Sequence, residues 1–292
     1  IMKVLERAFC LWDKTILNQG DEERMSKQVA AKLNGKAALV TGAAMGMGAA
    51  ISEVYAKYGA KLCMIDMSPK VEEKAEELRK KHGAEIITRI ANVTKPEDLK
   101  AAAEEMVKTF GRIDVACCNA GVCRLGNFLE MSEADRDFHI DVNIKGVWNT
   151  CKAVIPNMLE NGGGNIVIAS SVTGDIVADP GESAYALSKA ALVGLTKALA
   201  IEFAGKNIRV NCSQLGYART PMAESIAKQS NPDDPESALA DMAKGIPVHR
   251  LADPSEVGEL FAFLGCEESS YLTGSQIVID GAATIRESNM GV

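Results

Sequence analysis

The sequence predicts an α/β fold, a single doubly wound domain in which helices cover both faces of a seven-stranded parallel sheet. Short apolar runs alternate with helix-like stretches from residue 36 onward, as in βαβ units. A glycine-rich turn lies between the first apolar run and the first helix-like stretch. The chain has 292 residues, of which 47% are hydrophobic, and this suits one large domain with a sizeable core.

Seven apolar runs qualify as strands. They occupy residues 36–41, 61–66, 85–92, 113–119, 165–170, 207–213 and 275–279. Helical stretches follow the first five runs, at residues 47–58, 71–81, 96–110, 132–159 and 183–204. This alternation predicts one domain over residues 33–292.

Two segments stand outside the alternation. Residues 1–32 form a predicted N-terminal extension, whose short apolar stretch lacks the cleavage site of a secretory signal. Met25 reads as an ordinary start, so the preceding residues are either an upstream extension or a docking arm. Residues 217–251 contain a polar turn and no strand, and insertions at strand carboxyl ends usually shape substrate sites. We therefore predict a substrate lid there.

Composition excludes several classes of partner. The formal net charge of −7 makes the chain a poor binder of phosphate backbones, so we expect no nucleic-acid partner. No uncharged apolar run approaches the ~18–20 residues of a membrane span, so we expect no membrane association. The eight cysteines form no C-x-x-C pair and have no histidine at metal-ligand spacing. They predict reduced, buried thiols in a cytoplasmic protein, with no disulfide and no metal site.

The turn after the first strand has the character of a phosphate-binding loop. Its glycines follow a G-x-x-x-G-x-G spacing, which lets the backbone approach a pyrophosphate at a helix N-terminus. A plain tight turn is the alternative, but the position between a strand and a helix favours a dinucleotide. The expected contacts are Gly42, Met45, Gly46, Met47 and Gly48.

Asp66 ends the second predicted strand and Met67 follows it. A carboxylate there can accept hydrogen bonds from the adenosine ribose hydroxyls, and its charge would repel a 2′-phosphate. The alternative is an ordinary solvated aspartate at a strand end. After the glycine-rich loop, Asp66 predicts NAD(H) rather than NADP(H).

A candidate proton-transfer pair lies in the fifth helical stretch. Tyr185 and Lys189 stand four residues apart and so share one face of a helix. A cation beside a phenol favours the phenolate, which would bring proton exchange nearer neutral pH. By itself the pair could be a coincidence on an amphipathic helix. However, Ser171 ends the preceding strand, where its hydroxyl could hydrogen-bond a substrate oxygen, and Asn143 lies in the long helix before that strand.

The combined motifs resemble the short-chain dehydrogenase/reductase family over residues 34–285. The matching positions are Thr41, Gly42, Gly46, Gly48, Asn119, Ala120, Gly121, Asn143, Ser171, Tyr185 and Lys189. The resemblance implies a Rossmann fold and an oxidoreductase. Residues 122–126, 172–175 and 222–226 are similar to one bacterial group within this family.

The resemblance implies a role for each matched residue. Tyr185 would exchange the hydroxyl proton, and Lys189 would lower the pKa of Tyr185 and bind the nicotinamide ribose. Ser171 would polarise the carbonyl. Asn143 would hold a water in the proton relay. The other implied cofactor contacts are Asn92 and Val93 at the adenine, Asn119, Ala120 and Gly121 along the cofactor, and Gly216, Ala218 and Thr220 at the nicotinamide end.

The sequence departs from the family pattern outside the Ser–Tyr–Lys set. Asn92 stands where the family commonly has Asp, Cys118 where it has Asn, Leu215 where it has Pro, and Ala282 where it has Gly. An amide at residue 92 can still hydrogen-bond, but without charge. These departures bear on cofactor affinity and loop stiffness rather than on the proton-transfer residues.

The sequence thus predicts an NAD(H)-dependent enzyme that interconverts a small alcohol and an aldehyde or ketone, and the family resemblance implies a homotetramer or dimer. A nucleotide-binding regulatory or scaffold protein on the same fold is the alternative, because one fold hosts many functions. A lyase or epimerase with bound NAD is less favoured. The sequence does not identify the substrate. Five apolar residues of the lid region suit either a substrate surface or the core: Met222, Ile226, Met242, Ile246 and Val248.

Overall fold

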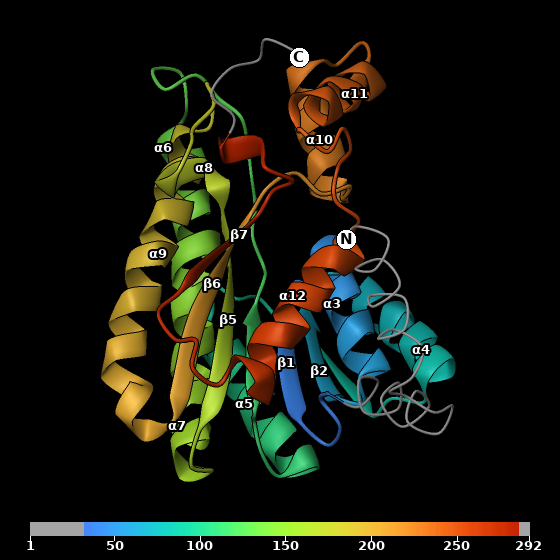
Figure 1. Ribbon diagram of the computed structural model, residues 1–292, viewed down its shortest axis with the longest axis vertical. Coiled ribbons are helices and arrows are strands. Elements are labelled where there is room, and N and C mark those ends of the chain that lie inside the picture. Colours follow the sequence, from blue (N-terminus) through green and yellow to red (C-terminus); the bar gives the residue numbers. More distant parts are fainter. Residues whose placement is uncertain (1–31, 286–292) are drawn as a thin grey trace, which may run out of the picture.

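The protein folds around a parallel sheet of seven strands in the order β3-β2-β1-β4-β5-β6-β7 (Figure 1). The computed structural model describes residues 32–285, so the predicted N-terminal extension lies, but for Lys32, outside the described residues. The strands are β1 (Ala37–Thr41), β2 (Lys61–Asp66), β3 (Ile86–Ile90), β4 (Val115–Cys118), β5 (Gly164–Ser171), β6 (Ile208–Leu215) and β7 (Gln276–Ile279). Every neighbouring pair is parallel, which confirms the predicted doubly wound Rossmann fold.

The strand order reverses beside β1. The chain runs outward from β1 through β2 to β3 and then returns to place β4 on the other side of β1. The carboxyl ends of β1 and β4 therefore diverge into loops on opposite sides of one crevice, which is where open α/β sheets bind ligands.

Two helical layers cover the sheet, each over its own apolar core. One layer contains α3 (Gly46–Lys57), α4 (Lys70–His82) and α12 (Pro254–Gly265), and the other contains α5 (Pro96–Phe110), α7 (Gly146–Glu160) and α9 (Ser183–Phe203). The remaining α-helices are α6 (Glu133–His139), α8 (Val172–Asp175), α10 (Pro221–Ser230) and α11 (Pro235–Gly245). Short 3-10 turns lie at Ala204–Lys206, Glu267–Ser269 and Ala283–Ile285.

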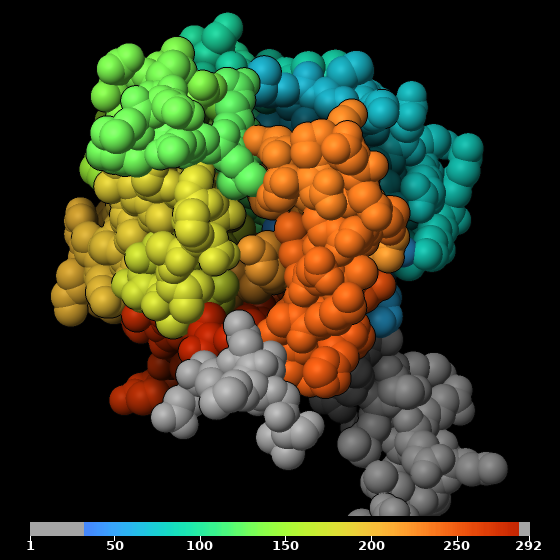
Figure 2. Space-filling view, turned by 90° about the horizontal axis from the view of Figure 1, so that it is seen from above, coloured from blue at the N-terminus to red at the C-terminus, as the bar shows by residue number. Residues whose placement is uncertain are grey.

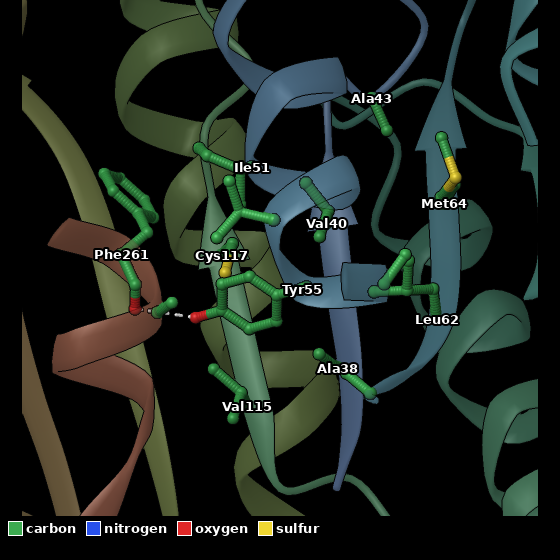
Figure 3. Packing of buried hydrophobic residues seen from close by; sticks show 14 of the residues in the cluster. Ala38, Val40, Ala43, Ile51, Tyr55, Leu62, Met64, Val115, Cys117 and Phe261 are labelled. Carbon is green, nitrogen blue, oxygen red and sulfur yellow. Dashed lines mark hydrogen bonds between the residues drawn. The ribbon is translucent and has the colours of Figure 1, made fainter. Parts of the chain in front are cut away.

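Helix α12 was not predicted from the sequence, and it packs against α3 in the core. The Tyr55 hydroxyl on α3 donates to the Phe261 carbonyl over 2.8 Å (Figure 3). Gly258 and Gly265 disfavour a helix locally but allow this packing. A Cβ at residue 258 would lie 2.7 Å from a Val54 methyl, and one at residue 265 would lie 2.5 Å from the Tyr55 oxygen. These glycines conceal the helix in the sequence and permit its close approach in the fold.

The long helix predicted at residues 132–159 is interrupted. A π-helical turn, Ile140–Lys145, separates α6 from α7 and contains Asn143. Such turns are rare and often occur at functional sites. The predicted lid region holds α10 and α11, which stand above the carboxyl end of the sheet in Figure 1.

One described helix, Ser183–Lys206, is long and apolar enough to span a membrane by length and composition alone. In the fold it packs against β5 and β6 and carries Tyr185 and Lys189. A core helix of an α/β protein meets the same criterion, so the helix is weak support for a span.

Candidate functional site

A continuous cleft lies at the carboxyl end of the sheet. It consists of two adjoining cavities of about 800 and about 410 Å³, which share Met47, Asn119, Gly121, Thr220 and Met222 in their walls. Figure 2 shows the hollow between the α10–α11 segment, in orange, and the green and yellow parts of the chain. The larger one is termed the loop cavity, because the glycine-rich loop lines it. The smaller one is termed the α9 cavity, because Tyr185 and Lys189 of α9 line it.

The glycine-rich loop forms one wall of the loop cavity. Gly42 and Gly46 have φ of +68° and +57°, a conformation that glycine adopts without steric cost. Gly42, Met45, Gly46 and Met47 line the cavity, as the sequence predicts for a cofactor loop. Gly48 lines neither cavity. It packs beneath the loop, where a Cβ would lie 1.9 Å from the Gly42 carbonyl oxygen.

Thr41 joins the loop after β1 to the loop after β4. Its hydroxyl oxygen accepts hydrogen bonds from the backbone N–H groups of Asn119 and Ala120, both over 3.1 Å. The Asn119 side chain donates back to the Thr41 carbonyl over 3.0 Å. Asn119, Ala120 and Gly121 then line the loop cavity. Thr41 matches the family pattern, but this cross-link was not predicted from the sequence.

Asp66 lies half-buried at the end of β2 and lines the loop cavity with Met67. One carboxylate oxygen accepts from the Ala44 N–H over 2.9 Å and the other from the Ser68 N–H over 2.8 Å. A carboxylate has about four acceptor positions, so Asp66 retains capacity for further donors. These backbone bonds hold the carboxylate at the edge of the glycine-rich loop.

The two predicted adenine residues differ in placement. Val93 lines the loop cavity. Asn92 does not, and its side-chain oxygen accepts from the Thr94 N–H over 2.9 Å, while its own N–H donates to Asp98. Asn92 therefore shapes the turn after β3, and a direct contact with a ligand is not supported by its position.

Ser171, Tyr185 and Lys189 converge on the α9 cavity, Ser171 from the end of β5 and the other two from α9. The Lys189 ammonium lies 5.7 Å from the centre of the Tyr185 ring and donates to the Ala169 carbonyl over 2.8 Å. The Ser171 hydroxyl accepts from the Thr173 N–H over 3.1 Å. The fold thus brings Ser171 beside Tyr185 and Lys189, which lie 14 and 18 positions later in the sequence.

The electrostatics of Tyr185 depend mainly on its burial. Burial raises its pKa above the usual value, and a hydrogen bond with Ser171 acts in the opposite direction without overcoming burial. Burial also lowers the pKa of Lys189 to about 8. The lowering of the Tyr185 pKa by Lys189 stays a prediction, because burial is the largest influence on the pKa of Tyr185 in this structure.

Asn143 lies behind the cleft rather than in its wall. Its side-chain oxygen accepts from the Val122 N–H over 2.8 Å, and its side-chain nitrogen donates to the Val122 carbonyl and to the Ser188 hydroxyl. A Cβ at Gly121 would lie 3.4 Å from both the Asn143 oxygen and the Lys189 nitrogen. Gly121 thus lies between the Asn143 side chain and the Lys189 ammonium.

The loop after β6 faces the α9 cavity. Gly216, Ala218 and Thr220 line it, and the Thr220 hydroxyl also caps α10 by accepting from the Ala223 N–H over 3.3 Å. Of the apolar lid residues, Met222, Ile226, Met242 and Ile246 line this cavity and Val248 does not. Three further lining residues, Cys123, Tyr217 and Glu182, were not identified from the sequence, since no motif marks them.

The cysteines of the described chain are all unpaired. Six are buried and Cys123 is half-buried. Within residues 32–285, no group of three histidine, cysteine or acidic side chains is placed to hold a metal ion.

Comparison with known proteins identifies the family. Residues 42–284 match the family described as Enoyl-(Acyl carrier protein) reductase. The chain is 61% identical to the oxidoreductase UcpA of Salmonella typhimurium over 257 residues, which cover 88% of this chain and 97% of that protein. This is the bacterial group that residues 122–126, 172–175 and 222–226 resemble.

Solved structures of other proteins have a similar fold. Levodione reductase superposes with a TM-score of 0.84 at 30% identity, covering 86% of this chain and 98% of that one. L-Sorbose reductase from Gluconobacter frateurii, solved with NADPH and L-sorbose, superposes with a TM-score of 0.83 at 30% identity, covering 89% and 100%. Fold, motifs and relatives together show that this chain belongs to the short-chain dehydrogenase/reductase family of oxidoreductases.

Proposed function

We propose that the protein is an NAD(H)-dependent dehydrogenase or reductase that interconverts a small alcohol and its aldehyde or ketone. One observation carries the proposal. Ser171, Tyr185 and Lys189 line a cavity that is continuous with the cavity of the glycine-rich loop. A dinucleotide along the loop cavity would have its reactive end near these three side chains.

In the proposed reaction, the bound nicotinamide supplies or accepts the hydride. Tyr185 gives a proton to the substrate oxygen during reduction and removes it during oxidation. The Ser171 hydroxyl donates a hydrogen bond to that oxygen and stabilises the charge that develops on it. Lys189 contributes positive charge beside Tyr185 and holds the nicotinamide ribose.

Asn143 has a supporting role in this proposal. Its hydrogen bonds with Val122 and Ser188 hold the backbone beside Lys189. A water associated with this group would connect Lys189 to solvent and replenish the proton that Tyr185 transfers.

NAD(H) is proposed over NADP(H) because of Asp66. The carboxylate is held by two backbone N–H groups in the wall of the loop cavity, and Met67 next to it offers no positive charge for a 2′-phosphate. L-Sorbose reductase was solved with NADPH, so this fold does not by itself exclude NADP(H), and we assign the discrimination to residue 66.

We further propose that residues 33–292 form the catalytic domain, that residues 217–251 close over the substrate, and that the protein works in the cytoplasm, where its cysteines stay reduced. Exposed apolar side chains on α7 and α9, namely Trp148, Leu187 and Ile201, support a homotetramer or dimer built through these helices. Light scattering tests the assembly, and a mass of 31.1 kDa at micromolar concentration would contradict it.

The function is tested with a panel of alcohols, aldehydes and ketones, followed by NADH absorbance in both directions. We expect turnover of at least one alcohol–carbonyl pair, and we expect this turnover to depend on Tyr185. NADH binding without turnover of any pair would instead favour a nucleotide-binding regulatory protein.

A further inference from the structure

Glu182 is a buried carboxyl group in the wall of the α9 cavity. Only 4% of the residue is exposed to solvent, and it directly precedes the first residue of α9 without capping the helix through its side chain. Thr173 hydrogen-bonds the carboxyl, yet Oε2 is buried with no hydrogen-bond partner among the described residues. Burial of an unpaired polar atom is costly, so such an atom calls for an explanation.

Among the described residues, no lysine or arginine forms an ion pair with Glu182. Lys189 is the only lysine or arginine that lines the α9 cavity, and its ammonium donates to the Ala169 carbonyl. Asp179 lines the same cavity and accepts a hydrogen bond from the Tyr217 hydroxyl over 3.3 Å. Burial and the charge of Asp179 both raise the pKa of Glu182. The cavity therefore offers acceptor oxygens and disfavours an anionic substrate.

The position of Glu182 relative to Tyr185 sets the geometry of a ligand. Glu182 is the N-cap residue of α9 and Tyr185 lies three positions later, within the first turn of the helix, and both line the α9 cavity. A substrate whose carbonyl oxygen lies at Tyr185 and Ser171 would therefore reach Glu182 with a group one or two carbons further along.

We propose that Glu182 is a specificity residue whose Oε2 accepts a hydrogen bond from a hydroxyl located one or two carbons from the reacting carbonyl. The preferred substrates are then uncharged hydroxy-ketones, hydroxy-aldehydes or the corresponding 1,2- or 1,3-diols. This inference rests on the proposed function and names its substrate class. A ketone without the hydroxyl would leave Oε2 buried and unpaired in the complex, and sites built to bind a hydroxyl strongly reject analogues that lack it.

Matched substrates test the inference. Kinetic constants are measured for 3-hydroxy-2-butanone against 2-butanone, and for 2,3-butanediol against 2-butanol, in the parent and in Glu182→Leu and Glu182→Gln. In the parent, kcat/KM is expected to be ~10²-fold higher for the hydroxylated member of each pair. Glu182→Leu should bring this ratio to about 1 by impairing only the hydroxylated substrate. Glu182→Gln should keep most of the ratio, because an amide oxygen still accepts a hydrogen bond.

Glu224→Gln is the matched control, since it removes an exposed carboxylate of α10 that does not line the cleft, and it should leave the ratio unchanged. Binding provides a second measurement. In Tyr185→Phe with NAD⁺, 2,3-butanediol should raise the melting temperature more than 2-butanol does, and Glu182→Leu should abolish the difference.

The outcomes separate the two claims. Equal kcat/KM for the two members of each pair in the parent, or an unchanged ratio in Glu182→Leu, overturns the role of Glu182 while 2-butanone turnover still supports the proposed function. Absence of both turnover and diol-dependent stabilisation would contradict the inference and the proposed function together.

Discussion

The Asn143 side chain donates a hydrogen bond to the Ser188 hydroxyl over 2.9 Å, and so joins the π-helical turn to α9. The Ser188 hydroxyl in turn donates to the Tyr185 carbonyl over 2.7 Å. Both Asn143 and Ser188 are fully buried. The backbone that carries Tyr185 is therefore tied to the turn that carries Asn143 by one hydroxyl group.

Ser188→Ala should loosen this connection without touching the cleft. The Asn143 amide would lose a buried acceptor, and we expect a loss of about 1–3 kcal/mol in the free energy of unfolding. Denaturant titration measures the loss. Ser188→Thr, which retains the hydroxyl, and Ser188→Cys, which replaces it with a weaker donor and acceptor, provide the comparison. An Ala variant as stable as the parent would show that the hydrogen bond does not contribute to stability.

Tyr185→Phe removes only the hydroxyl and nearly preserves shape. We expect turnover to fall by ~10²–10⁴ while NADH binding, measured by fluorescence titration, stays close to the parent. Ser171→Ala should lower turnover with little effect on NADH, and Lys189→Met should impair both. If Tyr185 were a packing residue, its variant would lose NADH binding and melting temperature together. A folded Tyr185→Phe protein with the parent rate would end the mechanistic proposal.

The lowered pKa of Lys189 predicts a pH-dependent stability. The ordinary lysine pKa is 10.5, and burial lowers it to about 8 in the folded protein. Between these values the unfolded chain holds a proton that the folded chain has released. The free energy of unfolding therefore gains up to about 1.4 kcal/mol per pH unit from this group as pH rises.

The measurement is urea unfolding of the parent and of Lys189→Met between pH 6 and pH 10, without cofactor. Subtraction of the two curves cancels the titration of tyrosines and cysteines. The difference, parent minus variant, should be flat below pH 7.5 and should rise from pH 8 toward pH 10. A flat difference over the whole range would mean that Lys189 keeps an ordinary pKa.

Asp66→Ala should reduce the preference of the protein for NADH over NADPH. Removing the carboxylate eliminates repulsion of a 2′-phosphate and also its acceptor positions for ribose hydroxyls. We expect weaker NADH binding and stronger NADPH binding, with dissociation constants from fluorescence titration as the measurement. Glu73→Ala, which removes an exposed carboxylate of α4 outside the cleft, is the control. Tighter binding of NADPH than of NADH by the parent protein would refute the assignment of Asp66.

The sequence by itself determined the features that depend on neighbours along the chain. Alternating apolar and helical periods located all seven strands, and the glycine spacing at residues 42–48 located the loop. Tyr185 and Lys189 share a helix face because four residues make about one turn. Ser171 reaches the same cleft because the carboxyl ends of parallel strands lie at one edge of the sheet.

Only the tertiary structure decided what depends on packing between distant segments. Helix α12 forms against α3 despite its glycines, and Gly48 packs beneath the loop at a place where the Gly42 carbonyl leaves no room for a Cβ. The raised pKa of Tyr185 and the unpaired oxygen of Glu182 arise from burial. Burial is set by side chains from many elements at once, so the loss of hydration that governs both groups has no signature in the local sequence.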